Sequence, residues 1–87
     1  MEKQKLQQVL ADHAAWLKDP EKGKMADLRG VDLQGAYLQE ANLQEADLQE
    51  ANLQEANLQE ADLRWADLRW ADLYIGNIRV SPLKEEQ

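Results

Sequence analysis

The sequence contains no cysteine among its 87 residues. Disulfide bonds, thiolate metal sites and thiol nucleophiles are therefore excluded. Long apolar runs are also missing, since no segment approaches the ~20 residues of a membrane span. The residues after Met1 lack the continuous apolar core of a secretory signal, because Gln7, Gln8, Asp12 and His13 interrupt it. We therefore expect one cytoplasmic domain that does not contact a membrane.

Basic residues are scarce in the middle of the chain. Residues 26–80 hold eleven acids and four arginines, a charge of −7, whereas residues 1–25 hold five lysines and four acids, a charge of +1. No basic residue occurs between Glu40 and Asp62. Nucleic-acid binding depends on Lys and Arg side chains that neutralise phosphates, so we expect no direct nucleic-acid binding. The acidic surface still suits an unknown protein partner with a basic surface.

A five-residue repeat occupies residues 26–80 in eleven units without an insertion, for example Ala41-Asn42-Leu43-Gln44-Glu45. In an α-helix each unit would advance by about 140°, and the leucines would spiral around every side. In one long strand successive leucines would point to opposite faces, because five is odd. The chain must therefore turn once per unit. Leu, called position i, and Ala at i−2 then lie inside, while Asp or Asn at i−1 points outward and bonds nearby backbone.

The run Ala-Asp/Asn-Leu-x-x resembles the signature of the pentapeptide-repeat family, over 55 of the 87 residues. The resemblance implies an all-β solenoid, a right-handed quadrilateral β-helix with four units per coil and positions i and i−2 inside. Residue n then stacks on residue n+20, and eleven units make nearly three coils. The alternative is disorder, since the repeat is polar and low in complexity, but the leucine register never slips. The expected leucine columns are Leu28/Leu48/Leu68, Leu33/Leu53/Leu73, Leu38/Leu58/Ile78 and Leu43/Leu63/Leu83.

Residues 1–25 form the lead-in to the repeat. Their apolar spacing predicts one amphipathic helix from about Glu2 to Lys18, which Asp19-Pro20 ends. Terminal repeats need caps, so we expect this helix to cover the open end of the coil rather than to dock into a partner's groove. We expect His13 to be a packed residue, because no partner that would activate it is evident. The predicted cap residues are Leu6, Val9, Leu10, His13, Trp16 and Leu17.

The outward position i+2 changes in character along the repeat, from glycine to glutamate to large apolar residues. Trp and Tyr are enriched at the centres of protein interfaces, so we favour a homodimer through the C-terminal coil. The alternative is that the tail, residues 81–87, folds over the same residues. The candidate interface consists of Trp65, Trp70, Tyr74, Ile75 and Val80.

The glutamates at i+2 form a candidate acidic surface, Glu40, Glu45, Glu50, Glu55 and Glu60. The simplest interpretation is a solvated surface. Some proteins of the family that this chain resembles mimic DNA and bind DNA gyrase, so the alternative is an acidic DNA mimic that inhibits or protects such a type II topoisomerase. A coil stack of about 13 Å, at about 4.8 Å per coil, spans only about four base-pair steps.

No motif in the sequence indicates catalysis, a cofactor or a metal, and an exterior row of carboxylates lacks the converging groups that such sites need. We therefore expect a non-enzymatic structural or protein-interaction module of three parts: a cap at residues 1–25, a β-helix at 26–80 and a tail at 81–87. The near-identity of the units in 41–63 fits either recent duplication or consensus design.

Overall fold

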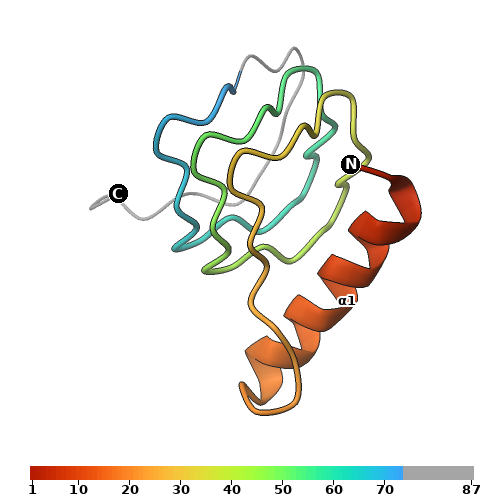
Figure 1. The fold of residues 1–87 in the computed structure, drawn as a ribbon, viewed down its shortest axis with the longest axis vertical. Coiled ribbons are helices and arrows are strands. Elements are labelled where there is room, and N and C mark those ends of the chain that lie inside the picture. Colours follow the sequence, from red (N-terminus) through yellow and green to blue (C-terminus); the bar gives the residue numbers. More distant parts are fainter. Residues whose placement is uncertain (74–87) are drawn as a thin grey trace.

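The computed structural model describes residues 1–73, one helix followed by a chain that winds into stacked coils (Figure 1). Three residues of the predicted interface, Tyr74, Ile75 and Val80, lie outside the described residues, as do Ile78 and Leu83 of the predicted leucine columns and the predicted tail at 81–87.

Helix α1 spans Lys3–Lys18 and begins one residue later than the sequence predicts. Glu2 precedes it with extended backbone, and Asp19, also extended, follows it immediately before Pro20. The connector then doubles back along the helix, where the Lys24 N–H donates a hydrogen bond to the Asp12 carbonyl (3.1 Å). Gly23 is required at this approach, because a Cβ atom there would collide with the backbone of Asp12 and Trp16.

Successive coils stack in parallel with a register of 20 residues. Six isolated bridges each join residue n to residue n+20, from Asp27 with Asp47 to Asn52 with Asp72. The register is maintained by backbone hydrogen bonds such as that from the Leu28 N–H to the Asp47 carbonyl (2.8 Å). Four five-residue units therefore make one coil. Within residues 1–73 the bridges are not extended into strands, because the chain turns again after each unit.

Each unit ends in a tight corner. The Val31 N–H donates to the Leu28 carbonyl (3.2 Å), and equivalent bonds close the later corners. The third residue of each corner, at position i+2, has a positive φ, as in a type II turn. This residue is Gly30 (67°) at the first corner and Glu40 (60°) at the third. The chain thus changes direction by placing one residue per unit in the left-handed region.

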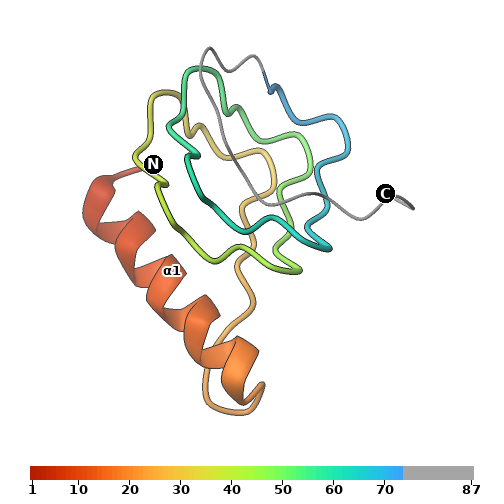
Figure 2. The same ribbon diagram turned by 180° about the vertical axis from the view of Figure 1, so that it is seen from behind.

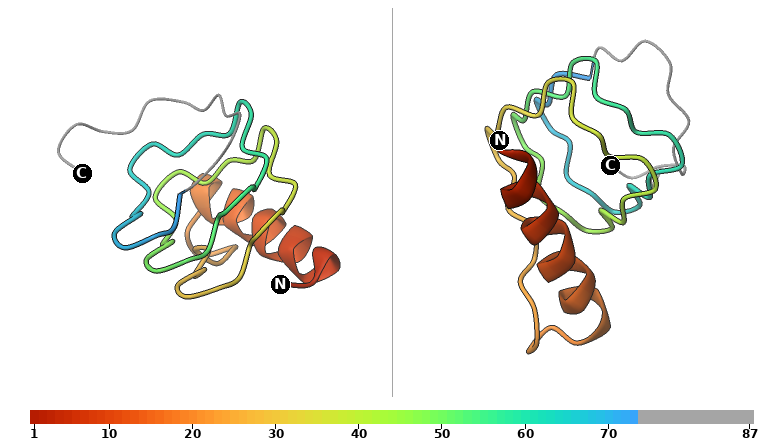
Figure 3. Two further views of the ribbon diagram at one scale, coloured as in Figure 1. Left: turned by 90° about the horizontal axis from the view of Figure 1, so that it is seen from above. Right: turned by 90° about the vertical axis from the view of Figure 1, so that its right-hand side faces the viewer.

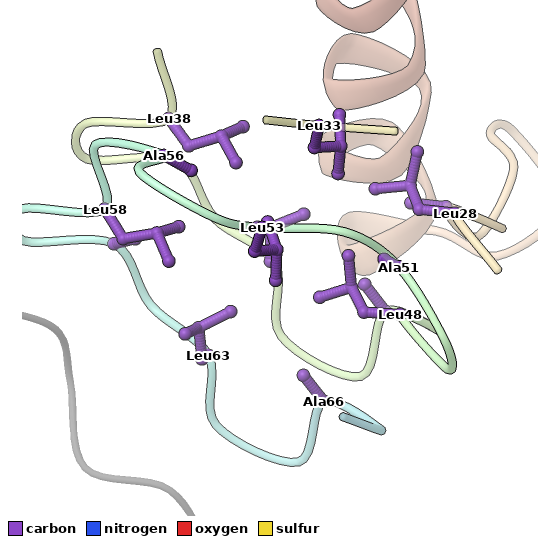
Figure 4. Close-up of a cluster of buried hydrophobic side chains, with 14 of the residues drawn as sticks. Leu28, Leu33, Leu38, Leu48, Ala51, Leu53, Ala56, Leu58, Leu63 and Ala66 are labelled. Carbon is purple, nitrogen blue, oxygen red and sulfur yellow. The ribbon is translucent and has the colours of Figure 1, made fainter. Parts of the chain in front are cut away.

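The interior of the coils is filled by leucine and alanine (Figure 4). Position i is buried from Leu28 to Leu63, and position i−2 is buried from Ala46 to Ala66. Leu73 continues the predicted column of Leu33 and Leu53, but contrary to expectation its side chain is 43% exposed. It belongs to the last coil that the structure describes, and no described residue stacks on it. Leu68, in the same coil, is only partly buried.

Helix α1 lies against the first coil and away from the last described one (Figures 2 and 3). Leu6 of α1 is buried, and Val9 and Leu10 pack against the leucine core. The apolar stripe of the helix thus covers the end of the coil stack at which Leu28 and Leu33 lie (Figure 4).

Candidate interaction surfaces on the coils

The two described tryptophans of the predicted interface stand on successive corners of the last coil. Trp65 is 49% exposed and Trp70 is 84% exposed. Both occupy position i+2 with positive φ, 68° and 64°. The Glu50 N–H donates to the Arg69 carbonyl (3.0 Å), so Trp70 follows the corner column of Glu50, and Trp65 follows that of Glu45. The two indoles therefore project from neighbouring corners of the same coil.

All five glutamates of the predicted acidic surface are exposed corner residues. Their φ values lie between 60° and 66°. Glu40 and Glu60 share one corner column, whereas Glu45, Glu50 and Glu55 occupy the other three. Sequence reasoning missed that these residues adopt the left-handed conformation. Gly30 and Gly35 at the same position of the repeat were the signal that could have indicated it.

Aspartate–arginine pairs lie on the sides between corners, because positions i−1 and i+1 both point outward. Arg29 contacts Asp27 at 2.8 Å, Arg64 contacts Asp62 at 2.6 Å, and the third pair, Arg69 with Asp67, is separated by 2.7 Å. Each aspartate also accepts a hydrogen bond from the backbone N–H of its arginine. These sides therefore carry far less net negative charge than their aspartates suggest.

The same pairs change the acidity of the aspartates. The hydrogen bond from the Arg29 side chain holds the pKa of Asp27 at about 2. Hydrogen bonds from Arg64 and Arg69 lower the pKa values of Asp62 and Asp67 in the same direction. A lowered carboxyl pKa stabilises the folded chain above the ordinary value of about 3.9, and for Asp27 that contribution disappears as the pH falls toward 2. The contribution is small, because these pairs are exposed to solvent.

His13 joins helix α1 to the first coil and is fully buried. Its Nδ1 lies 2.9 Å from the backbone nitrogen of Ala26, and its Nε2 lies 2.7 Å from the carbonyl oxygen of Gln44. The Ala26 amide can only donate, so Nδ1 must accept, and Nε2 therefore carries the hydrogen that is donated to Gln44. The ring also stacks on Trp16, with centroids 5.5 Å apart.

The other predicted cap residues are less completely enclosed than His13. Leu6 is buried, Val9 and Leu10 are partly buried against the core, and Trp16 and Leu17 are half-buried. An open groove of about 480 Å³ lies between the first half of α1 and residues 32–37. Lys3 approaches it, with Nζ 6.0 Å from the ring centroid of Tyr37.

The described residues contain no group of three His, Cys, Asp or Glu side chains that could hold a metal ion. Among the same residues, no helix is both long and apolar enough to cross a membrane.

Coils of four five-residue units define a class of repeat protein, and comparison with known families identifies it. Residues 26–64 and 36–73 match the family described as pentapeptide repeats, in eight copies. Since the matches together cover residues 26–73, more than half of the chain, the protein belongs to the pentapeptide-repeat family. Proteins of this family are generally non-enzymatic. No curated protein matches the chain.

Proposed function

We propose that the chain is a right-handed quadrilateral β-helix of nearly three coils, capped by α1, that serves as a non-enzymatic structural or protein-interaction module. The register of 20 residues and the family membership support this architecture. An interaction role is supported by the separation of buried and outward positions within each unit. Positions i and i−2 are committed to the core, so only the outward positions differ in chemistry from one coil to the next.

The exposure of Trp70 is the observation that carries the proposal. An indole that is 84% exposed leaves a large apolar surface in water, and tryptophan is among the residues that most often dominate binding at interfaces. Trp65 adds a second indole in the same coil. We therefore propose that two copies of the chain associate through the C-terminal coil, to which Tyr74, Ile75 and Val80 belong by sequence.

Light scattering at several protein concentrations tests this proposal. We expect the wild type to reach about twice the 10.0 kDa mass of one chain, and the double variant Trp65→Glu/Trp70→Glu to remain at the mass of one chain. Glutamate is a suitable replacement because Glu50 and Glu55 already occupy the same corner conformation. Each substitution therefore removes an apolar surface without a new demand on the backbone.

Tyr37→Glu is the matched control, because Tyr37 is an exposed aromatic residue on the first coil. This variant should associate as the wild type does. A wild type that keeps the mass of one chain at every concentration would contradict the dimer and favour coverage of the tryptophans by residues 81–87. A double variant with unchanged mass would place the contact elsewhere.

The exposure of the five corner glutamates supports a second candidate function. Together they present carboxylates on all four corner columns of the coil stack. Such a surface suits a partner that normally binds the phosphates of DNA, such as a type II topoisomerase, which the chain would inhibit or protect.

A further inference from the structure

We propose that His13 is a pH-sensitive latch, which holds helix α1 on the first coil when its ring is neutral and releases the helix when the ring is protonated. Both polar atoms of the ring form hydrogen bonds with backbone atoms of the first coil. Release would uncover the end of the stack at which Leu28 and Leu33 lie (Figure 4).

The imidazole occupies the place of two backbone groups that a preceding unit would supply. Within the repeat, the carbonyl at position i+1 accepts a hydrogen bond from the i+2 N–H of the coil before it. The Gln49 carbonyl, for example, accepts from the N–H of Gly30. Gln44 stands at the equivalent position one unit before Gln49, and its carbonyl accepts from His13 Nε2 instead.

The second hydrogen bond of His13, at Nδ1, also replaces a bond that the repeat forms elsewhere with its own backbone. The Val31 N–H donates to the carbonyl of Leu28 in the preceding unit, and every later described unit up to Ala71 repeats this bond. Ala26 begins the first unit, and its N–H donates to His13 Nδ1. One neutral ring thus satisfies a donor and an acceptor at the start of the coil, which is why its bonds matter for the cap.

Protonation is incompatible with this arrangement. A neutral imidazole has one donor and one acceptor, whereas the imidazolium has two donors. A hydrogen on Nδ1 would face the Ala26 N–H across 2.9 Å, in a fully buried position where water cannot take the place of an acceptor. The stacked Trp16 touches the face of the ring and offers no acceptor to its edge. Release of α1 lets water solvate the charged ring.

Four charged residues lie within two positions, along the sequence, of His13 or of its bonded partners Ala26 and Gln44. They are Asp12 on α1, Lys24 in the connector, and Asp27 and Glu45 beside the two bonded residues of the coil. Asp12 accepts from Gln8, and Asp27 is bound by Arg29. Carboxyl groups ordinarily protonate near pH 4, whereas an exposed histidine takes up a proton below about pH 6.5. Between pH 7.5 and 5 the carboxyl groups therefore stay largely ionised.

The test combines ¹⁵N NMR of the histidine ring with amide hydrogen exchange on the full chain between pH 7.5 and 5. His13 is the only histidine, so its ring signals are unambiguous. At pH 7.5 we expect a neutral ring with the hydrogen on Nε2. Because release takes up one proton, the opening equilibrium of α1 should rise up to roughly tenfold per pH unit as the pH falls. The amides of Leu48 and Leu53 should keep their protection.

Three outcomes in the wild-type chain would overturn the latch. One is a ring that stays neutral while α1 keeps its protection at pH 5. Another is a protonated ring with α1 still protected. The third is a parallel loss of protection in α1 and at Leu48 and Leu53, which would mean that the whole chain unfolds rather than that the helix leaves.

His13→Gln is the matched variant, because a carboxamide offers one acceptor and one donor group but does not titrate. We expect α1 of this variant to be equally protected at both pH values. In His13→Ala, α1 should lose protection at both. A pH response in His13→Gln as large as in the wild type would rule out His13 as the sensor, and the wild-type ring signals decide the question if a variant fails to fold.

Discussion

At the scale of single residues, the corner position i+2 carries a conformational free-energy cost that cannot be read from the identity of its side chains. Seven residues other than glycine have positive φ in the described coils, five glutamates and two tryptophans. The left-handed conformation costs an ordinary residue roughly 1–2 kcal/mol, whereas glycine and asparagine adopt it readily. The corners that carry the acidic and aromatic surfaces are therefore also the most strained positions of the repeat.

Replacing Glu50 by asparagine should stabilise the chain. We expect the free energy of unfolding to rise by about 1 kcal/mol, because asparagine relieves the left-handed backbone at φ 63°. Urea unfolding followed by circular dichroism measures the change. Glu50→Gln is the control, since it removes the same charge but keeps the strain. Equal gains in the two variants would show that charge repulsion, not backbone conformation, limits stability at this corner.

At the scale of elements, the leucine columns differ in how completely they are enclosed. Leu53 is 1% exposed between Leu33 below and Leu73 above, while Leu73 is 43% exposed. The same side chain therefore occupies two environments within one column. The loss on truncation should follow the surface that each leucine buries and the cavity that it leaves.

We expect Leu53→Ala to lower the free energy of unfolding by about 3 kcal/mol, and Leu73→Ala by about 1 kcal/mol or less. Urea titration of both variants gives the comparison directly. Losses of equal size would mean that Leu73 is as well enclosed in solution as Leu53, which would contradict the exposure described above.

The helix and the inward positions could be predicted from the sequence because local patterns determine them. The apolar stripe and Pro20 located α1 to within one residue, and the spacing of Ala and Leu identified the inward face. The number of sides could not be derived from a period of five, and it came from the family resemblance. The bonds of His13 could not be predicted either, because their partners are backbone atoms up to 31 residues away.

At the scale of the whole molecule, the negative charge is distributed unevenly over the surface. The net charge is −7, but several aspartates on the sides are paired with arginines. The corner glutamates are exposed on all four columns. The charge that a partner would meet is thus concentrated at the edges of a short stack.

We expect no inhibition of DNA gyrase supercoiling when the chain is added at micromolar concentration. Three coils at about 4.8 Å each span only about four base-pair steps of DNA, which is little surface for competition with a long duplex. Inhibition would contradict this expectation and support the mimic. A variant with all five corner glutamates changed to glutamine should then lose the effect if those carboxylates cause it.

The register of 20 residues fixes the position of every outward side chain by two coordinates, its side of the coil and the coil to which it belongs. Inserting five residues would shift all later side chains to the next side. Inserting 20 residues would move them by one whole coil and leave each on its own side. Lengthening of the array can therefore either preserve a pattern on the surface or rotate it, depending only on whether the insertion completes a circuit.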